Sequence, residues 1–141
     1  MLFRSRRLAP DVDEARENEN LDILGRKIKA RWVSDDVVLF DFKDICEGPR
    51  SQNDYIEVAQ RFHAVLISNI PVFNGKNDDS ARRFINLVDE FYDRNVKLLL
   101  TAAAQVEQLY VAGKLSFEFQ RTVSRLLEMQ SEEYLEAAHK A

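Results

Sequence analysis

The hydrophobic and polar positions divide the chain into a polar start and a patterned remainder. Residues 1–20 combine three early arginines with the acidic stretch DVDEARENEN and show no periodicity, so we expect a flexible arm there. Over residues 21–42, short alternating runs are separated by Gly25 and by the polar cluster 34–36, which predicts a small antiparallel meander. Asp41 lies between two phenylalanines and is expected to be an ordinary, solvent-facing strand residue.

The middle of the chain has the pattern of a strand–helix–strand unit. Ser51 and Asp54 have the spacing of a capping box and predict a helix start. The apolar runs 63–70 and 96–104 are typical of strands buried on both faces. Between them we expect a helix over 79–94, capped by Asp78 or Asp79. Its broad apolar face consists of Phe84, Ile85, Leu87, Val88, Phe91 and Tyr92. Strands joined by such a crossover helix run parallel.

The last part of the chain predicts an amphipathic helix. It follows a short helix expected over 105–113, which Gly113 ends. Its apolar stripe contains Phe119, Val123, Leu126, Leu127 and Tyr134, and its polar stripe contains Arg121, Arg125, Glu128 and Glu132. We therefore predict an α/β fold with a parallel strand-helix-strand unit, a small antiparallel meander and a C-terminal amphipathic helix. The ordered module is expected over residues 21–135, with a tail over 136–141.

Composition narrows the classes of function. With 141 residues, 45% of them hydrophobic, the chain is long enough for one domain with a core. The net charge is −4, and the basic residues are interspersed with acidic ones, which argues against a nucleic-acid or anionic-membrane surface. No apolar run approaches the roughly 20 residues that span a bilayer. The single cysteine, Cys46, excludes an internal disulfide and favours a reducing, cytoplasmic compartment.

Two pairs of arginines are candidate functional residues. Arg121 and Arg125 are four residues apart in the stretch FEFQRTVSRLLEMQS, so a helix places both charges on one face at a small energetic loss. Nearby carboxylates such as Glu128 can absorb this repulsion, or the two guanidinium groups can bind an anion. Arg82 and Arg83 lie near the start of the preceding helix, where the helix dipole disfavours cations. Both pairs fit either a solvated surface or a site for an anion or a partner's carboxylates.

Other candidates for catalysis or nucleotide binding favour structural roles or are missing. His63 has no nucleophile or paired carboxylate at motif spacing, so we expect a hydrogen-bonded structural histidine. Cys46 is expected to be buried rather than reactive. The four glycines never occur in the spacing GxxxxGK[ST], whose backbone amides cradle phosphates. We therefore expect no cofactor or metal in this chain alone, and neither binding nor hydrolysis of ATP.

Three stretches carry a resemblance to a known family: LFDFKDICEGPRSQNDYIEVAQRFHAVLISNIPVF, NDDSARRFINLVDEFYDRNVKLLL and LSFEFQRTVSRLLEMQSEEYL. Over residues 25–135 the chain resembles the C-terminal part of the ZapE-like cell-division ATPases and their mitochondrial relatives. The resemblance implies a longer protein that uses ATP and magnesium. It also implies that hydrolysis is coupled to remodelling of a protein partner, in bacteria the tubulin-like division ring at the inner face of the membrane.

The resemblance implies a role for this chain as a module. Members of the family carry a P-loop core that this sequence does not contain, so we expect a fragment or module that is inactive alone. Its partners would be the rest of the ATPase core or a full-length relative, with recruitment to the division site. An alternative is a free-standing, non-enzymatic interaction module that binds a division protein, and a small independent enzyme ranks third.

The resemblance also gives the arginines a role. P-loop ATPases stabilise transition-state charge with arginines from another element or subunit, and Arg121, Arg125, Arg82 and Arg83 are the candidates here. Among them the sequence favours Arg125, at the centre of its helix. The loop after the second strand has Ala103 and Gln105 where the family tends to have an acidic residue and a proline, so the resemblance assigns no role to that loop in this chain.

Overall fold

The computed structural model describes residues 15–137, which form a mixed five-stranded sheet in the order β1-β2-β3-β4-β5. The first three strands pair antiparallel, and β3, β4 and β5 pair parallel. This confirms the predicted α/β fold with its meander and its parallel unit. The strands are β1 (Arg16–Ile23), β2 (Arg26–Val33), β3 (Val37–Asp41), β4 (Ala64–Ile70) and β5 (Lys97–Ala102).

The meander begins earlier than the hydrophobic pattern indicates. β1 starts at Arg16, which pairs with Val33 of β2, so residues 16–20 are strand rather than flexible arm. Their side chains are mostly exposed, and a strand with no buried face gives no apolar alternation. Gly25 makes the turn between β1 and β2 with φ +82°, and its N–H donates to the Asp22 carboxylate at 3.0 Å. The rest of the predicted arm, residues 1–14, lies outside the described residues, as do residues 138–141 of the tail.

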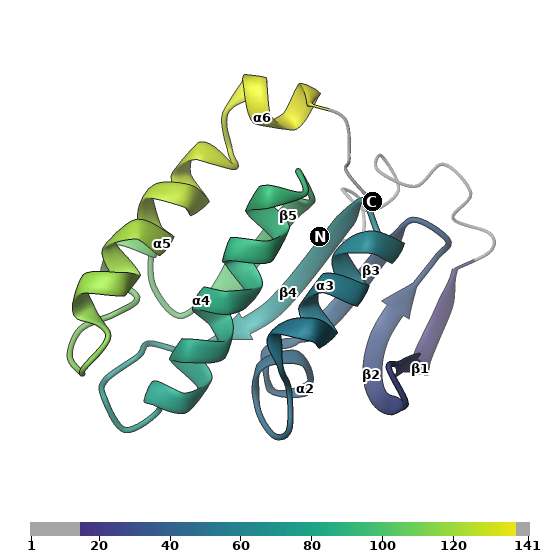
Figure 1. The fold of residues 1–141 in the computed structure, drawn as a ribbon, viewed down its shortest axis with the longest axis horizontal. Coiled ribbons are helices and arrows are strands. Elements are labelled where there is room, and N and C mark those ends of the chain that lie inside the picture. The colour runs from purple at the N-terminus through teal and green to yellow at the C-terminus, as the bar shows by residue number, and fades with distance from the viewer. Residues whose placement is uncertain (1–14, 138–141) are drawn as a thin grey trace.

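Figure 1 shows α3, α4 and α5 side by side on one face of the sheet. α3 begins where the capping box predicts, and the Asp54 carboxylate accepts a hydrogen bond from Ser51 N at 2.8 Å. The N-cap of α4 is Asn77, not Asp78 or Asp79. The helical elements are α2 (Phe42–Cys46), α3 (Gln52–Arg61), α4 (Asp78–Asp93), the 3-10 turn η2 (Val106–Gln108), α5 (Ser116–Glu128) and α6 (Glu132–Glu136).

The main core lies between the sheet and these helices. Phe84, Val88 and Phe91 of α4 are fully buried in it, as the periodicity of that helix predicts. The Phe84 ring lies 5.8–6.2 Å from the rings of Phe42, Phe73 and Phe119, so aromatic contacts join α2, α4 and α5. A second cluster lies on the opposite face of the sheet and contains Trp32, Val37, Leu39, Ala64 and Leu66.

Asp41 corrects one sequence prediction. It is buried, and it caps α2, accepting a hydrogen bond from Lys43 N at 3.4 Å. The alternation argument fails because the strand ends at Asp41 and a helix begins at Phe42. The residue therefore lies at a strand-to-helix junction rather than on a solvent-facing strand.

The C-terminal segment is two helices rather than one. α5 ends at Glu128, and the Ser131 hydroxyl accepts a hydrogen bond from Tyr134 N at the start of α6. Leu127 is 43% exposed and does not belong to the buried stripe, which instead runs through Phe119, Thr122, Leu126 and Met129. Of the short helix predicted over 105–113, only the 3-10 turn at 106–108 forms.

β5 also differs from its prediction. Its apolar sequence is typical of a strand with neighbours on both sides, but β5 is the last strand of the sheet and its residues 97–101 are only half-buried. The predicted parallel pairing with β4 is confirmed. Among the described residues, only one side of β5 is paired with another strand.

Candidate functional site

Helices α4 and α5 lie side by side (Figure 1) and are joined by a row of polar contacts that we call the α4–α5 seam. At its start, Arg82 of α4 pairs with Glu118 of α5 at 3.0 Å. At its end, the Tyr92 hydroxyl donates to the Glu128 carboxylate at 2.7 Å. Because α4 and α5 are both amphipathic, their polar faces meet where their apolar faces turn towards the sheet. The seam is therefore accessible to solvent, and the apolar faces of the same two helices lie beneath it in the main core.

The centre of the seam is the carboxylate of Asp89, which binds two arginines. Arg121 Nη2 lies 3.0 Å from Oδ2, and Arg125 Nη1 lies 2.6 Å from Oδ1. The carboxylate that absorbs the repulsion between the arginines thus comes from the neighbouring helix. Glu128 accepts from Tyr92 instead. These three groups together carry a charge of +1, since Arg is always protonated; with Arg82, Glu118 and Glu128 included, the charges of the seam balance.

The two arginines are held to different degrees. The Arg125 guanidinium lies 4.8 Å from the centre of the Tyr92 ring and its side chain is 24% exposed, so a cation–π contact adds to its ion pair. The Arg121 side chain is 60% exposed and has the Asp89 contact at 3.0 Å. Exposed pairs of this kind contribute only about 0 to 1 kcal/mol. Arg121 can therefore leave Asp89 for another anion at small cost, whereas Arg125 is anchored.

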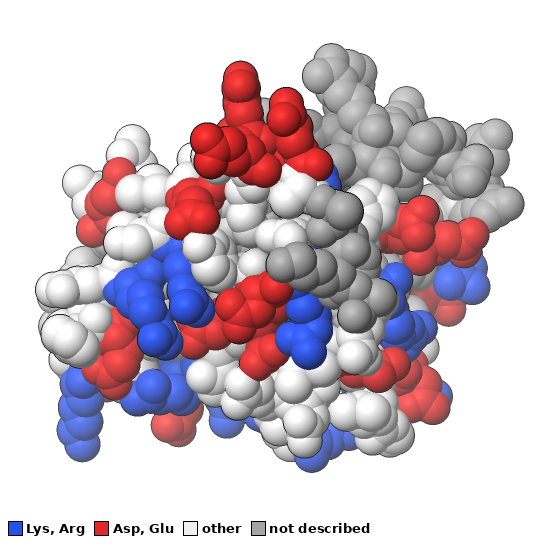
Figure 2. Space-filling view, turned by 45° about the horizontal axis from the view of Figure 1, so that its top comes forward, with Lys and Arg blue, Asp and Glu red and all other residues white. Residues whose placement is uncertain are grey.

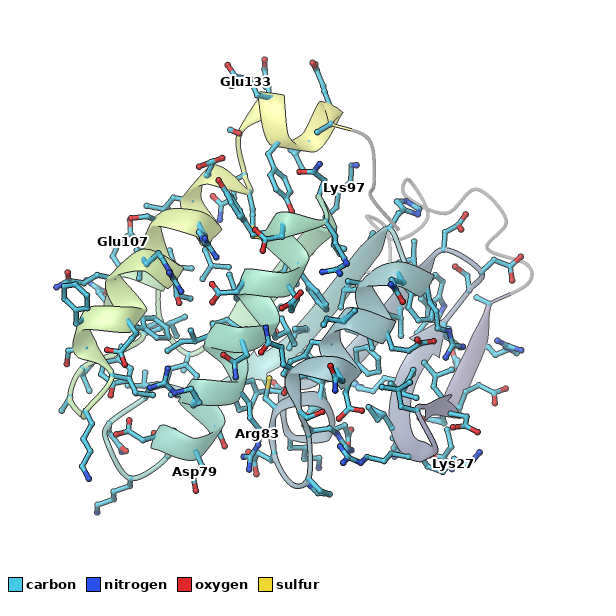
Figure 3. All side chains as sticks on the ribbon, in the orientation of Figure 1. Lys27, Asp79, Arg83, Lys97, Glu107 and Glu133 are labelled. Carbon is cyan, nitrogen blue, oxygen red and sulfur yellow. The ribbon has the colours of Figure 1, made fainter. Side chains whose placement is uncertain are left out.

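Arg83 lies away from this group. Its Nη1 donates to the backbone carbonyl of Cys46 at 3.5 Å, and Figure 3 shows it on the side of α4 that faces α2. The structure thus brings Arg82, Arg121 and Arg125 together on the α4–α5 seam and separates Arg83 from them. Each of the four predicted arginines contacts an acceptor atom in the described part of the chain.

A polar network at the carboxyl ends of β3 and β4 was missed by the sequence reasoning. Asp41 Oδ1 accepts from the Asn69 amide at 2.6 Å and from the Ser68 hydroxyl at 3.4 Å, and Arg31 donates to Ser68 at 3.1 Å. Open α/β sheets commonly place ligands at this edge. The sequence feature that could have indicated this network is the polar pair Ser68–Asn69 near the end of the apolar run 63–70. Here the Asp41 oxygens bond to protein donors, so the network links β2, β3 and β4.

Cys46 is fully buried, which confirms its prediction. Burial raises the pKa of its thiol to about 12, so the thiol is protonated and unreactive at neutral pH. The backbone of His63 joins the sheet, donating to Asp36 O and accepting from Lys97 N, both at 2.9 Å; the role of its imidazole stays a prediction. Within residues 15–137, no three His, Cys, Asp or Glu side chains gather as metal ligands.

Charge on the visible surface is mixed. Figure 2 shows Lys and Arg side chains next to Asp and Glu side chains over much of the face in view, and a separate group of Asp and Glu side chains at its top. This agrees with the interspersed charges of the sequence. No helix among residues 15–137 is long and apolar enough to cross a membrane.

Comparisons with known proteins place the chain in a family. A family model described as AFG1-like ATPase matches residues 5–138. The chain is 44% identical over 127 residues to the cell division protein ZapE of Escherichia coli strain K12, a match that covers 89% of this chain and 34% of that protein. It is 31% identical over 146 residues to lactation elevated protein 1 homolog B of Danio rerio, covering 81% of this chain and 29% of that protein.

No solved structure matches the chain significantly. The chain spans about a third of the length of the curated relatives that it matches. The family match covers nearly all of the chain, including all of α4 and α5 with their arginines. The chain belongs to the AFG1-like ATPase family and is similar to a ZapE-type cell-division protein.

Proposed function

We propose that this chain works as the C-terminal module of a ZapE-like P-loop ATPase that couples ATP hydrolysis to remodelling of a protein partner. The observation that carries the proposal is the match to the AFG1-like ATPase family over residues 5–138. ATP and magnesium are bound by the part of the longer protein that this chain does not span. The partner is a cell-division protein, by similarity to the ZapE relative, and we propose the tubulin-like division ring at the cytoplasmic face of the membrane.

Within this function, we propose that the α4–α5 seam supplies a positive charge to the ATPase core. Arg121, rather than the Arg125 that the sequence favours, is the first candidate because its side chain is 60% exposed and it binds a carboxylate that it shares with Arg125. Arg125 fixes the position of that carboxylate from the other side. Arg82 is the next candidate because its pair with Glu118 is also partly exposed. Such a residue would act on ATP bound elsewhere, by stabilising the charge that develops during phosphoryl transfer.

The test uses a full-length relative, with the arginines aligned with Arg121, Arg125, Arg82 and Arg83 replaced one at a time by Gln. Loss of a transition-state arginine slows ATP turnover about a thousandfold or more and leaves nucleotide affinity nearly unchanged. A residue that only joins the modules slows turnover a few fold. The control is Gln at the position of Lys27, an exposed residue of β2 far from the seam (Figure 3). Turnover within twofold of the parent for all four arginine variants would exclude a catalytic role for the seam.

A further inference from the structure

The two edges of the sheet have different chemistry. The outer strand β1 carries four charged residues, Arg16, Glu17, Glu19 and Asp22, and charged side chains are a common device that prevents an edge from pairing with another strand. At the other edge, β5 has no charge after Lys97, and its next five residues are LLLTA. Only β1 is thus protected against further pairing.

The backbone of β5 is suited to accept another strand. Lys97 N donates to His63 O, and Ala103 N donates to Ile70 O, both at 2.9 Å, so the odd-numbered residues of β5 face β4. Because successive residues of a strand direct their N–H and C=O groups to opposite sides, those of Leu98 and Leu100 point away from the sheet. These groups form an open template for a sixth strand.

A groove of about 680 Å³ runs along this edge. Its walls include Leu98 and Leu100 of β5, Val106 of η2 and Leu126 of α5, with the more exposed Leu127 and Leu135 at the rim. Gln105, Glu107 and Gln130 also line it. The two rim leucines are each 43% exposed, and leucine side chains at that exposure are well placed to cover an apolar partner. The groove therefore presents several leucine side chains next to backbone groups of β5 that pair with no other strand among residues 15–137.

We propose that an uncharged, apolar strand from the two thirds of the longer family proteins that this chain does not span pairs with β5 and fills this groove. This inference rests on the proposed role as a module of a longer ATPase. The relatives are about three times as long as the region matched, which covers 34% of the ZapE protein, so the longer protein has ample chain to supply the strand. Main-chain hydrogen bonds to Leu98 and Leu100 hold the strand, and Leu127 and Leu135 cover its side chains.

The test compares hydrogen–deuterium exchange, resolved to single amides, in this chain and in the full-length ZapE relative. In this chain the amides of Leu98 and Leu100 should exchange at nearly the rate of unbonded amides, while the amide of Leu99, which faces β4, is protected. In the full-length relative the amides aligned with Leu98 and Leu100 should exchange at least about a hundredfold more slowly. The readout does not depend on ATP turnover, so its failure is distinct from failure of the proposed function.

A variant pair tests the groove itself. In the full-length relative, Lys at the position of Leu127 should restore fast exchange of the amides aligned with Leu98 and Leu100. The amide aligned with Leu99 should stay protected. The control is Lys at the position of Phe117, which lies on the same helix and is 82% exposed; it should change neither. Three results would overturn the proposal: equal exchange of these amides in both proteins, their protection already in this chain through self-association, or no effect of the Leu127→Lys variant.

Discussion

At the scale of single residues, Asp89 holds two guanidinium groups, and their different burial determines what each substitution does. Arg125→Gln removes a close ion pair and the contact with the Tyr92 ring, so it should lower the free energy of unfolding by about 1 kcal/mol. Arg121→Gln should lower it by no more than about 0.5 kcal/mol. Urea unfolding of both variants measures the difference, and a larger cost for Arg121→Gln would contradict the assignment of Arg125 as the anchor.

Gly113 is a residue that the fold requires. Its φ is +138°, and a Cβ there would lie 2.2 Å from the Tyr110 hydroxyl and 2.6 Å from Asp78 Oδ1. Those two groups are hydrogen-bonded at 2.7 Å, and Lys114 N also donates to Asp78. Gly113→Ala should therefore destabilise the chain by about 2 to 3 kcal/mol.

Gly25→Ala is the matched control for this substitution. Gly25 also has a positive φ, but a Cβ there meets nothing within 4 Å, so only backbone strain of about 1 kcal/mol is expected. The midpoints of urea unfolding compare the two variants. If Gly113→Ala lowers the free energy of unfolding no more than Gly25→Ala does, Tyr110 and Asp78 do not pack closely around Gly113 as described.

The Cys46 thiol gives a pH-dependent prediction. Burial raises its pKa to about 12 in the folded chain, against about 8.5 when unfolded. The unfolded chain loses this proton first, so the contribution to stability is complete below about pH 8.5 and declines as the pH rises towards 12. Labelling by a thiol reagent should stay slow from pH 7 to 9 in the native chain and be fast in urea. Fast native labelling that increases tenfold per pH unit would show an accessible thiol.

At the scale of secondary-structure elements, α4 is the helix that organises the core. Phe84 is fully buried and contacts three other phenylalanine rings. Phe84→Ala should lower the free energy of unfolding by about 3 to 5 kcal/mol, which is enough to unfold a marginally stable domain. Phe117→Ala, on an 82% exposed side chain, should change stability by no more than about 0.5 kcal/mol. A cost below about 1 kcal/mol for Phe84→Ala would show that α4 does not pack as described.

The elements also show what a sequence pattern can and cannot predict. α3, α4, β4 and the parallel pairing of β5 follow from apolar periodicity, because each buries a continuous face. Apolar periodicity does not predict a strand whose two faces are both exposed, as at residues 16–20. It also does not predict the point at which a strand leads directly into a helix, as at Asp41. For the candidate site, it placed Arg121 and Arg125 on one face, but their carboxylate, Asp89, lies 32 residues away from Arg121 along the chain. That pairing depends on how α4 and α5 pack.

At the scale of the whole molecule, the chain lacks the glycine spacing of a phosphate loop. We predict that the isolated chain does not bind magnesium–ATP more tightly than about 100 µM, which corresponds to roughly 5.5 kcal/mol. Titration calorimetry measures this directly. Tighter binding would mean that the chain contains a nucleotide site of another kind.

The most direct test of the module assignment is ATP turnover by a chimera. The region of this chain that matches the E. coli ZapE relative, 44% identical over 127 residues, replaces the corresponding third of that protein. Circular dichroism and a single cooperative unfolding transition establish that the chimera folds. If this chain is the C-terminal module of a ZapE-like ATPase, the chimera should hydrolyse ATP within about tenfold of the parent rate, because the seam and the β5 edge provide the same contacts to the core. A folded chimera that binds ATP but hydrolyses it no faster than the relative without this third would contradict the account.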